Sequence, residues 1–274
     1  MYHQEIQRAV EQTKAQRTFV PSITNMVTMH AVANTQIAVG GSPAMFFLAD
    51  EGVSLANKCD AMYINLGTLT PQYKDLVPQT ILQLEREGKK WVLDPVGLGK
   101  GQLHNALIAF IKEHPPTIIK GNASEIIKLA QIWKLTEESS QLTGVDSLDA
   151  VEQALKAAIE LAIFIQNPVV VSGPTDLITD GKTMVISYGG SAWMETISGM
   201  GCMLGGVMAV YLAHSNPMIA AITAVNAFNV AGQKAEQVAQ GPGTFQAHFL
   251  DSLYHLTADE IASNPMKEVN DEKL

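Results

Sequence analysis

Cysteine is scarce in this sequence: only Cys59 and Cys202 occur among 274 residues. Two cysteines provide neither the disulfide framework of a small secreted protein nor paired metal-ligand spacing. Residues 1–19 are polar and mixed in charge, so they lack the apolar stretch of a secretory signal. Both absences favour a reducing compartment, and we expect a cytoplasmic protein.

Positive charge is also scarce. The formal net charge is -9, from 18 Lys and Arg against 27 Asp and Glu, and no basic run occurs. Nucleic acid and anionic membrane surfaces both need a basic footprint, so neither is expected as a main partner. The longest apolar stretches, 202–213 and 218–231, are short or interrupted by polar residues, which favours buried helices over membrane spans.

The sequence does contain enough apolar residues for a folded core, with 47% hydrophobic and 16% charged residues. Short β-rich runs alternate with amphipathic segments, which predicts an α/β fold with a mostly parallel central sheet and helices on both faces. Beyond residue 200 we expect almost only helix. No long linker or internal repeat occurs, so we expect one domain over 1–274. The predicted strands are 61–66, 91–94, 117–120, 169–172, 177–179 and 184–188, and the predicted helices include 72–87, 103–113, 123–133 and 147–164.

Glycine and polar residues follow four of these predicted strands, in the segments 65–67, 94–97, 120–122 and 172–174. Open α/β sheets bind ligands outside the carboxyl ends of their strands. For any single segment a plain turn is an adequate explanation. Four such segments together predict a binding site at this edge of the sheet.

The strongest motif is the turn of Gly199 and Gly201 at the start of an apolar helix. Glycine permits φ > 0 and lets backbone N–H groups approach an anion, and the helix N-terminus adds partial positive charge. A transferring phosphoryl group would be stabilised there. Cys202 lies in the first helical turn, where we expect a lowered thiol pKa. The motif is neither a Walker A loop nor a good dinucleotide fingerprint, so close packing around a buried cysteine is the alternative.

Two carboxylates follow neighbouring strands. Asp94 and Glu125 are candidates to hold Mg²⁺, directly or through water, as phosphoryl transfer requires. Lys120 is a candidate to meet nucleotide phosphates as a point charge. Glu125 has an alternative role, because Asn122 and Glu125 also have the spacing of a capping box.

Other candidates carry weaker signals. The hydroxyl of Ser172 is placed to contact a phosphate, although the segment before the expected hairpin at 180–181 also suits a simple turn. Asn25 and Met45 flank a helical stretch near the N-terminus, and Met45 either walls an apolar pocket or packs in the core.

Taken together, these segments resemble the hydroxyethylthiazole kinase family of the ribokinase-like superfamily, from about residue 23 to residue 254. The segments that carry the resemblance are TN (24–25), AN (33–34), GGSPAM (40–45), NLGTL (65–69), LDPVG (93–97), KGNASE (120–125), GVDS (144–147), SGP (172–174), DG (180–181), GMGC (199–202) and GPGTF (241–245). The resemblance implies that ATP, with Mg²⁺, phosphorylates the primary hydroxyl of 4-methyl-5-(2-hydroxyethyl)thiazole in thiamin salvage. It also implies a homotrimer whose sites lie between subunits.

The resemblance also implies roles for individual residues. It assigns thiazole binding to Met45, Gly199 and Asn25, ATP phosphate binding to Lys120 and Ser172, and the metal to Asp94 and Glu125. The catalytic set is the turn of Gly199 and Gly201 with Cys202, which stands where related sugar kinases carry an aspartate base. A thiolate at a helix N-terminus would accept the proton of the alcohol.

Four positions differ from the usual pattern of this family. Lys120 replaces Arg, Ser172 replaces Thr, Met200 replaces Thr in the turn, and Gly41 replaces Ala. Two alternatives follow: a ribokinase-like kinase for another small alcohol, and a thiazole- or nucleotide-binding protein that is catalytically weak. The presence of Asp94, Glu125 and Cys202 favours catalysis over binding alone.

Overall fold

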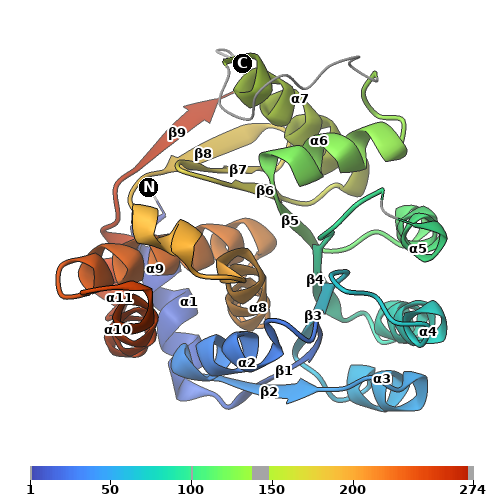
Figure 1. Ribbon diagram of the computed structural model, residues 1–274, viewed down its shortest axis with the longest axis horizontal. Coiled ribbons are helices and arrows are strands. Elements are labelled where there is room, and N and C mark those ends of the chain that lie inside the picture. The colour runs from blue at the N-terminus through green and yellow to red at the C-terminus, as the bar shows by residue number, and fades with distance from the viewer. Residues whose placement is uncertain (1, 100, 138–147, 271–274) are drawn as a thin grey trace.

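The computed structural model describes residues 2–99, 101–137 and 148–270. The nine strands of these ranges join one sheet in the order β2-β1-β3-β4-β5-β6-β7-β8-β9 (Figure 1). The pairs from β2 through β6 are parallel, and β7, β8 and β9 extend the sheet with antiparallel pairs. The predicted α/β class with a mostly parallel sheet is therefore confirmed.

The elements have the following bounds. The strands are β1 Thr18–Ile23, β2 Gly41–Met45, β3 Ala61–Asn65, β4 Lys90–Asp94, β5 Ile118–Asn122, β6 Val169–Ser172, β7 Asp176–Thr179, β8 Thr183–Ser187 and β9 Met266–Asn270. The α-helices are α1 His3–Ala15, α2 Met29–Ala38, α3 Ala49–Ala56, α4 Tyr73–Arg86, α5 Gln102–Glu113, α6 Ala123–Ile132, α7 Leu148–Ile165, α8 Met200–Leu212, α9 Pro217–Glu236, α10 Pro242–His255 and α11 Ala258–Ala262. A short 3-10 helix, η1, covers Ala192–Thr196.

Helices cover both faces of the sheet. Figure 1 shows α3 to α7 on one face and α1, α2 and α8 to α11 on the other. The two-residue period of the strands divides the apolar side chains between the two layers. Val92 and Ile118 belong to the core on the α8 side, whereas Leu93 and Ile119 belong to the opposite core. Because both faces are covered, the central strands are apolar almost throughout.

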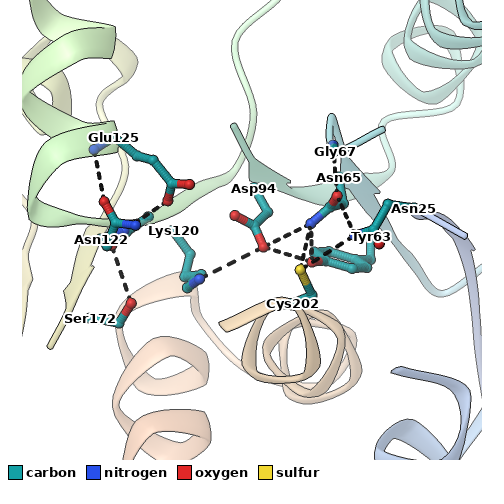
Figure 2. A network of polar contacts seen from close by, with 11 residues as sticks. Asn25, Tyr63, Asn65, Gly67, Asp94, Lys120, Asn122, Glu125, Ser172 and Cys202 are labelled. Atoms are coloured by element: carbon teal, nitrogen blue, oxygen red, sulfur yellow. Dashed lines mark hydrogen bonds and ion pairs between the residues drawn. The ribbon is translucent and has the colours of Figure 1, made fainter. Parts of the chain in front are cut away.

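Helix α8 lies against the middle of the sheet and is buried along almost its whole length. Two glycines allow this contact: a Cβ at Gly205 would lie 2.5 Å from the ring of Tyr63, and one at Gly206 would lie 2.8 Å from Val32. Without those Cβ atoms the helix packs closely on both β3 and α2. Its N-terminus is thereby held beside the carboxyl ends of the parallel strands, as Figure 2 shows.

Each predicted strand and helix has an observed counterpart whose described ends differ by at most two residues. The predicted hairpin at 180–181 connects β7 and β8. The motif at 144–147 and the start of the helix predicted from residue 147 lie outside the described residues. Among those that are described, no helix combines the length and hydropathy of a membrane span. The single domain over 1–274 stays a prediction.

Three strands were not predicted. β1 contains Pro21, and β2 has the sequence GSPAM, so both are poor in the residues that signal a strand. The expectation of almost only helix beyond residue 200 is wrong for β9, which pairs with β8 at the edge of the sheet. An edge strand buries little, and the polar sequence MKEVN therefore lacks the apolar run of a central strand.

Candidate active site

The candidate site lies at the carboxyl edge of β3, β4, β5 and β6, as the sequence predicts. These strands are neighbours in the sheet, so their last residues come together. Asn65 is aligned with Asp94 across β3 and β4, and Asn122 is aligned with Ser172 across β5 and β6. Figure 2 shows Asn65 and Asp94 beside Cys202 of α8, and Lys120 between them and the pair of Asn122 and Ser172.

Both glycines of the predicted turn lie in close contacts, and Gly199 also has a left-handed backbone conformation. Gly199 has a φ of 88°, and a Cβ there would lie 2.2 Å from Cγ2 of Thr28. A Cβ at Gly201 would lie 2.7 Å from Nζ of Lys120. The turn therefore does serve close packing, and it also places a cation against the N-terminus of α8. A lysine ammonium and the positive end of a helix together attract an anion.

Asp94 is the most enclosed charged group of the site, with no exposed surface. Its Oδ2 accepts hydrogen bonds from the hydroxyl of Tyr63 at 2.8 Å and from Nδ2 of Asn65 at 3.0 Å. Lys120 Nζ lies 3.7 Å from the same oxygen. Burial raises the pKa of Asp94, against the lowering effect of Lys120 and of both hydrogen bonds. Oδ1 is buried and has no hydrogen-bond partner, so one oxygen of this carboxylate remains available.

Lys120 holds its charge although it is only 3% exposed. Burial opposes the charged ammonium, but the neighbouring carboxylates of Asp94 and Glu125 outweigh that effect and raise the pKa of Lys120. The ammonium lies between the end of β4 and the start of α8 (Figure 2). A fixed positive charge thus lies at the centre of the candidate site.

Glu125 has the capping role that its spacing predicts. Asn122 Oδ1 accepts from the Glu125 backbone N–H at 2.9 Å, and Glu125 Oε2 accepts from the Asn122 backbone N–H at 3.0 Å. Burial and the charge of Asp94 raise the pKa of Glu125. The side chain therefore caps α6 and still lies close enough to Asp94 for the two charges to interact.

Cys202 faces a set of amide donors. Nδ2 of Asn65 lies 3.3 Å from its sulfur, and Nδ2 of Asn25 lies 3.5 Å from it. The expected lowering of the thiol pKa is wrong, because burial and the charge of Asp94 raise it. These two effects exceed the influence of Lys120 and of the amide donors. Cys59 is likewise buried, and both cysteines are free thiols.

A cavity of about 590 Å³ opens beside the glycine turn. Ser172, Gly199, Met200 and Gly201 all line it. The hydroxyl of Ser172 makes one long contact with a backbone carbonyl, at 3.4 Å. The structure therefore brings Ser172 and the turn to one cavity, with the Lys120 ammonium against Gly201.

Asn25 and Met45 lie in different places. Asn25 belongs to the site, because it contacts Cys202 and donates to Oδ1 of Asn65 at 3.1 Å. Met45 lies at the end of β2, aligned with Ser22 of β1, and lines a separate cavity of about 470 Å³. A thiazole contact stays a prediction for both residues.

Sequence reasoning did not assign roles to Tyr63, Asn65 and Asp176. Tyr63 and Asn65 are two residues apart on β3 and therefore share a face, the face that meets α8. A tyrosine and an asparagine at that spacing in an apolar strand are the signal that could have identified them. Asp176 lines the cavity together with Asn229 of α9, a residue that no motif connects to it.

Comparisons with known proteins found similar sequences and similar folds. A family model described as the hydroxyethylthiazole kinase family matches residues 10–259. A hydroxyethylthiazole kinase of Bifidobacterium animalis subsp. lactis is 42% identical over 275 residues, covering 96% of this chain and 91% of the relative. A solved structure of a hydroxyethylthiazole kinase protein from Pyrococcus horikoshii OT3 has a TM-score of 0.87 at 28% identity, covering 97% of this chain and 100% of that one. A ribokinase-like superfamily protein from Enterococcus faecalis, with a TM-score of 0.59 at 14% identity and 86% coverage of both chains, shares the fold.

The hydrogen bond from Tyr63 to Asp94 gives a prediction about stability. Tyr63→Phe should lower the free energy of unfolding by about 2–3 kcal/mol, because a buried carboxylate loses a donor. Tyr73→Phe is the matched control. Tyr73 is equally buried, but its hydroxyl donates to the neutral backbone carbonyl of Thr24. Its loss should therefore lower the free energy of unfolding by only about 1 kcal/mol. Urea unfolding at neutral pH measures both, and equal losses would contradict a charged acceptor at Asp94.

Proposed function

The chain belongs to the hydroxyethylthiazole kinase family, and on this premise we propose that it is an ATP-dependent hydroxyethylthiazole kinase. The γ-phosphoryl group of ATP is transferred to the primary hydroxyl of 4-methyl-5-(2-hydroxyethyl)thiazole. This activity would serve thiamin salvage in the cytoplasm. The family match over 10–259 and the relative at 42% identity support the reaction class.

The position of the Lys120 ammonium is the observation that carries this proposal. It lies 3.7 Å from Oδ2 of Asp94 and against Gly201 at the N-terminus of α8. Phosphoryl transfer depends mainly on positioning and on stabilising the charge of the transferred group. A buried cation and a helix N-terminus that meet at one point supply that stabilisation without reorganisation.

The substrates would approach this point from two sides. We propose that Lys120 and Ser172 bind the phosphates of ATP, whose natural place is the cavity that Ser172 lines. Gly199, Asn25 and Met45 would contact the thiazole alcohol. The contact between Asn25 and Cys202 supports the assignment of Asn25, because it places an amide beside the proposed proton acceptor.

Asp94 and Glu125 fit Mg²⁺, which uses one or two carboxylates and completes its shell with water and substrate phosphates. The unpartnered Oδ1 of Asp94 is a free ligand atom, and each carboxylate feels the other's charge. Within the described ranges no group of three or more His, Cys, Asp or Glu is placed to hold a metal ion. When bound there, Mg²⁺ would neutralise charge on the phosphates of ATP.

Cys202 is proposed as the acceptor of the alcohol proton. The O–H bond of the alcohol breaks as its oxygen bonds to phosphorus, the proton passes to the Cys202 sulfur, and ADP leaves with the electron pair of the broken P–O bond. The amides of Asn25 and Asn65 favour the thiolate. Because the pKa of Cys202 is raised, only a small thiolate fraction is present at neutral pH. Proton transfer should therefore contribute less than positioning and electrostatics.

We also propose a homotrimer with its sites between subunits. β2 is an edge strand, and large apolar side chains that follow β1 and β2 are exposed, namely those of Met26, Val27 and Leu48. Exposed apolar side chains of this size suit a subunit interface. Light scattering should give three times the chain mass of 29.5 kDa, and a monomer mass would contradict the assembly.

The activity is tested by mass spectrometry after incubation with Mg-ATP and the thiazole alcohol, beside a control without alcohol. We expect a phosphorylated thiazole that accumulates with time and requires enzyme. A panel of other small alcohols runs in parallel. Product from another alcohol alone would select a different kinase activity, and tight ATP binding without any product over hours would select a binding protein.

The role of Cys202 has its own test. Cys202→Ala should lower kcat about tenfold to a hundredfold, which is at or below the lower limit of the usual contribution of a general base. Cys202→Asp should retain activity, because a carboxylate at the same position also accepts a proton. Circular dichroism checks that both variants fold. A folded but inactive Cys202→Asp variant would count against a proton-acceptor role.

A further inference from the structure

Asp176 is a buried carboxylate that the proposed chemistry does not use. It begins β7, is 7% exposed, and lines the proposed nucleotide cavity together with Ser172 and Gly173. Burial raises its pKa to about 6, so the fold keeps a carboxylate here against a desolvation cost. A residue needed only for a turn would not have to be an acid facing a cavity.

The two oxygens of this carboxylate hold two different elements. One oxygen accepts a hydrogen bond from the backbone N–H of Gly173 at 3.2 Å, and the other accepts from Nδ2 of Asn229 at 3.1 Å. Gly173 directly follows Ser172, the proposed phosphate ligand, and Asn229 belongs to α9. Asp176 therefore ties the loop between β6 and β7 to a buried helix.

The amide of Asn229 is held in one orientation. Its Nδ2 also donates to Oγ of Ser187 at 3.1 Å, and that hydroxyl donates to Oδ1 of Asn226 at 2.8 Å. Asn264 donates to the same hydroxyl at 3.0 Å. If the side-chain amide of Asn229 were flipped, its Oδ1 would face both the Asp176 carboxylate and the Ser187 hydroxyl. Ser187 would then have to donate to Asn229 and would lose its hydrogen bond to Asn226. The donor presented to Asp176 is thus fixed by a fully buried network.

We propose that Asp176 is a positioning residue for the nucleotide, holding the Ser172–Gly173 loop in the conformation that binds the phosphates of ATP. This inference rests on the proposed kinase function. Gly173 N–H is bonded to Asp176, so the loop is fixed by protein contacts before ATP arrives and needs little ordering on binding. The positive charge of Lys120 offsets part of the desolvation cost of the ionised Asp176 carboxylate. The same lysine is the proposed ligand of the ATP phosphates.

The test is the affinity for ATP in three variants. In Asp176→Asn, the new amide can still accept from Gly173, but its NH₂ then faces the NH₂ of Asn229. We expect the Kd and KM for ATP to rise about tenfold, while kcat at saturating ATP and the KM for the alcohol change less than threefold. The double variant Asp176→Asn with Asn229→Asp restores a donor opposite an acceptor between these two positions. Because Ser187 must then donate to residue 229 instead of Asn226, we expect partial rescue, with a Kd clearly below that of Asp176→Asn.

Asp180→Asn is the matched control. Asp180 begins the turn that follows β7 and also accepts backbone N–H groups, from Lys182 and Thr183, but it does not line the cavity. Its Kd for ATP should stay unchanged. Calorimetry with a non-hydrolysable ATP analogue measures binding without turnover.

The outcomes separate the two proposals. A folded Asp176→Asn variant with unchanged Kd overturns the positioning role while the kinase function stands. Equal losses in kcat, ATP affinity and alcohol affinity, without rescue in the double variant, also overturn it, since they indicate a general structural role. A wild type that binds no nucleotide overturns both.

Discussion

The buried contact between Asp94 and Lys120 constrains the rest of the structure. The Asp94 carboxylate has no exposed surface and the Lys120 ammonium is 3% exposed. Burying two such charges is favourable only when they pair with each other and when further hydrogen bonds replace their lost hydration. Tyr63 and Asn65 supply donors to the carboxylate, and Gly201 leaves the space that the ammonium occupies. Three strands and one helix must therefore approach one another closely around this ion pair, and that requirement locates the candidate site.

A second buried carboxylate, that of Asp176, also interacts with the charge of Lys120 but has different hydrogen-bond partners. Asp176 is held mainly by neutral donors, a backbone N–H and the amide of Asn229, so desolvation dominates and raises its pKa. Asp94 has a cation within 3.7 Å. The two acids thus lie in different parts of the site. Asp94 lies with Cys202 and the proposed reacting groups, and Asp176 lines the cavity proposed for the nucleotide.

Some features of the site could be predicted from the sequence, and others could not. The polar ends of four strands were expected to meet at one edge of the sheet, and they do, because parallel neighbours bring their carboxyl ends together. The capping role of Glu125 was also correct, since a capping box spans only four residues. The prediction for the thiol pKa of Cys202 was wrong, because a local rule about helix N-termini omitted burial and the charge of Asp94, a residue 108 positions earlier in the chain.

The sequence by itself determined the fold class, the order of most elements and the family, since these follow from local periodicity and from motifs of a few residues. Only the tertiary structure decided which atoms meet. It left Oδ1 of Asp94 without a partner, brought Asn65 to Cys202, and joined Asp176 to Asn229 across 53 positions. Such contacts depend on how closely α8 and α9 approach the sheet, and that distance is set by packing between segments remote in the chain.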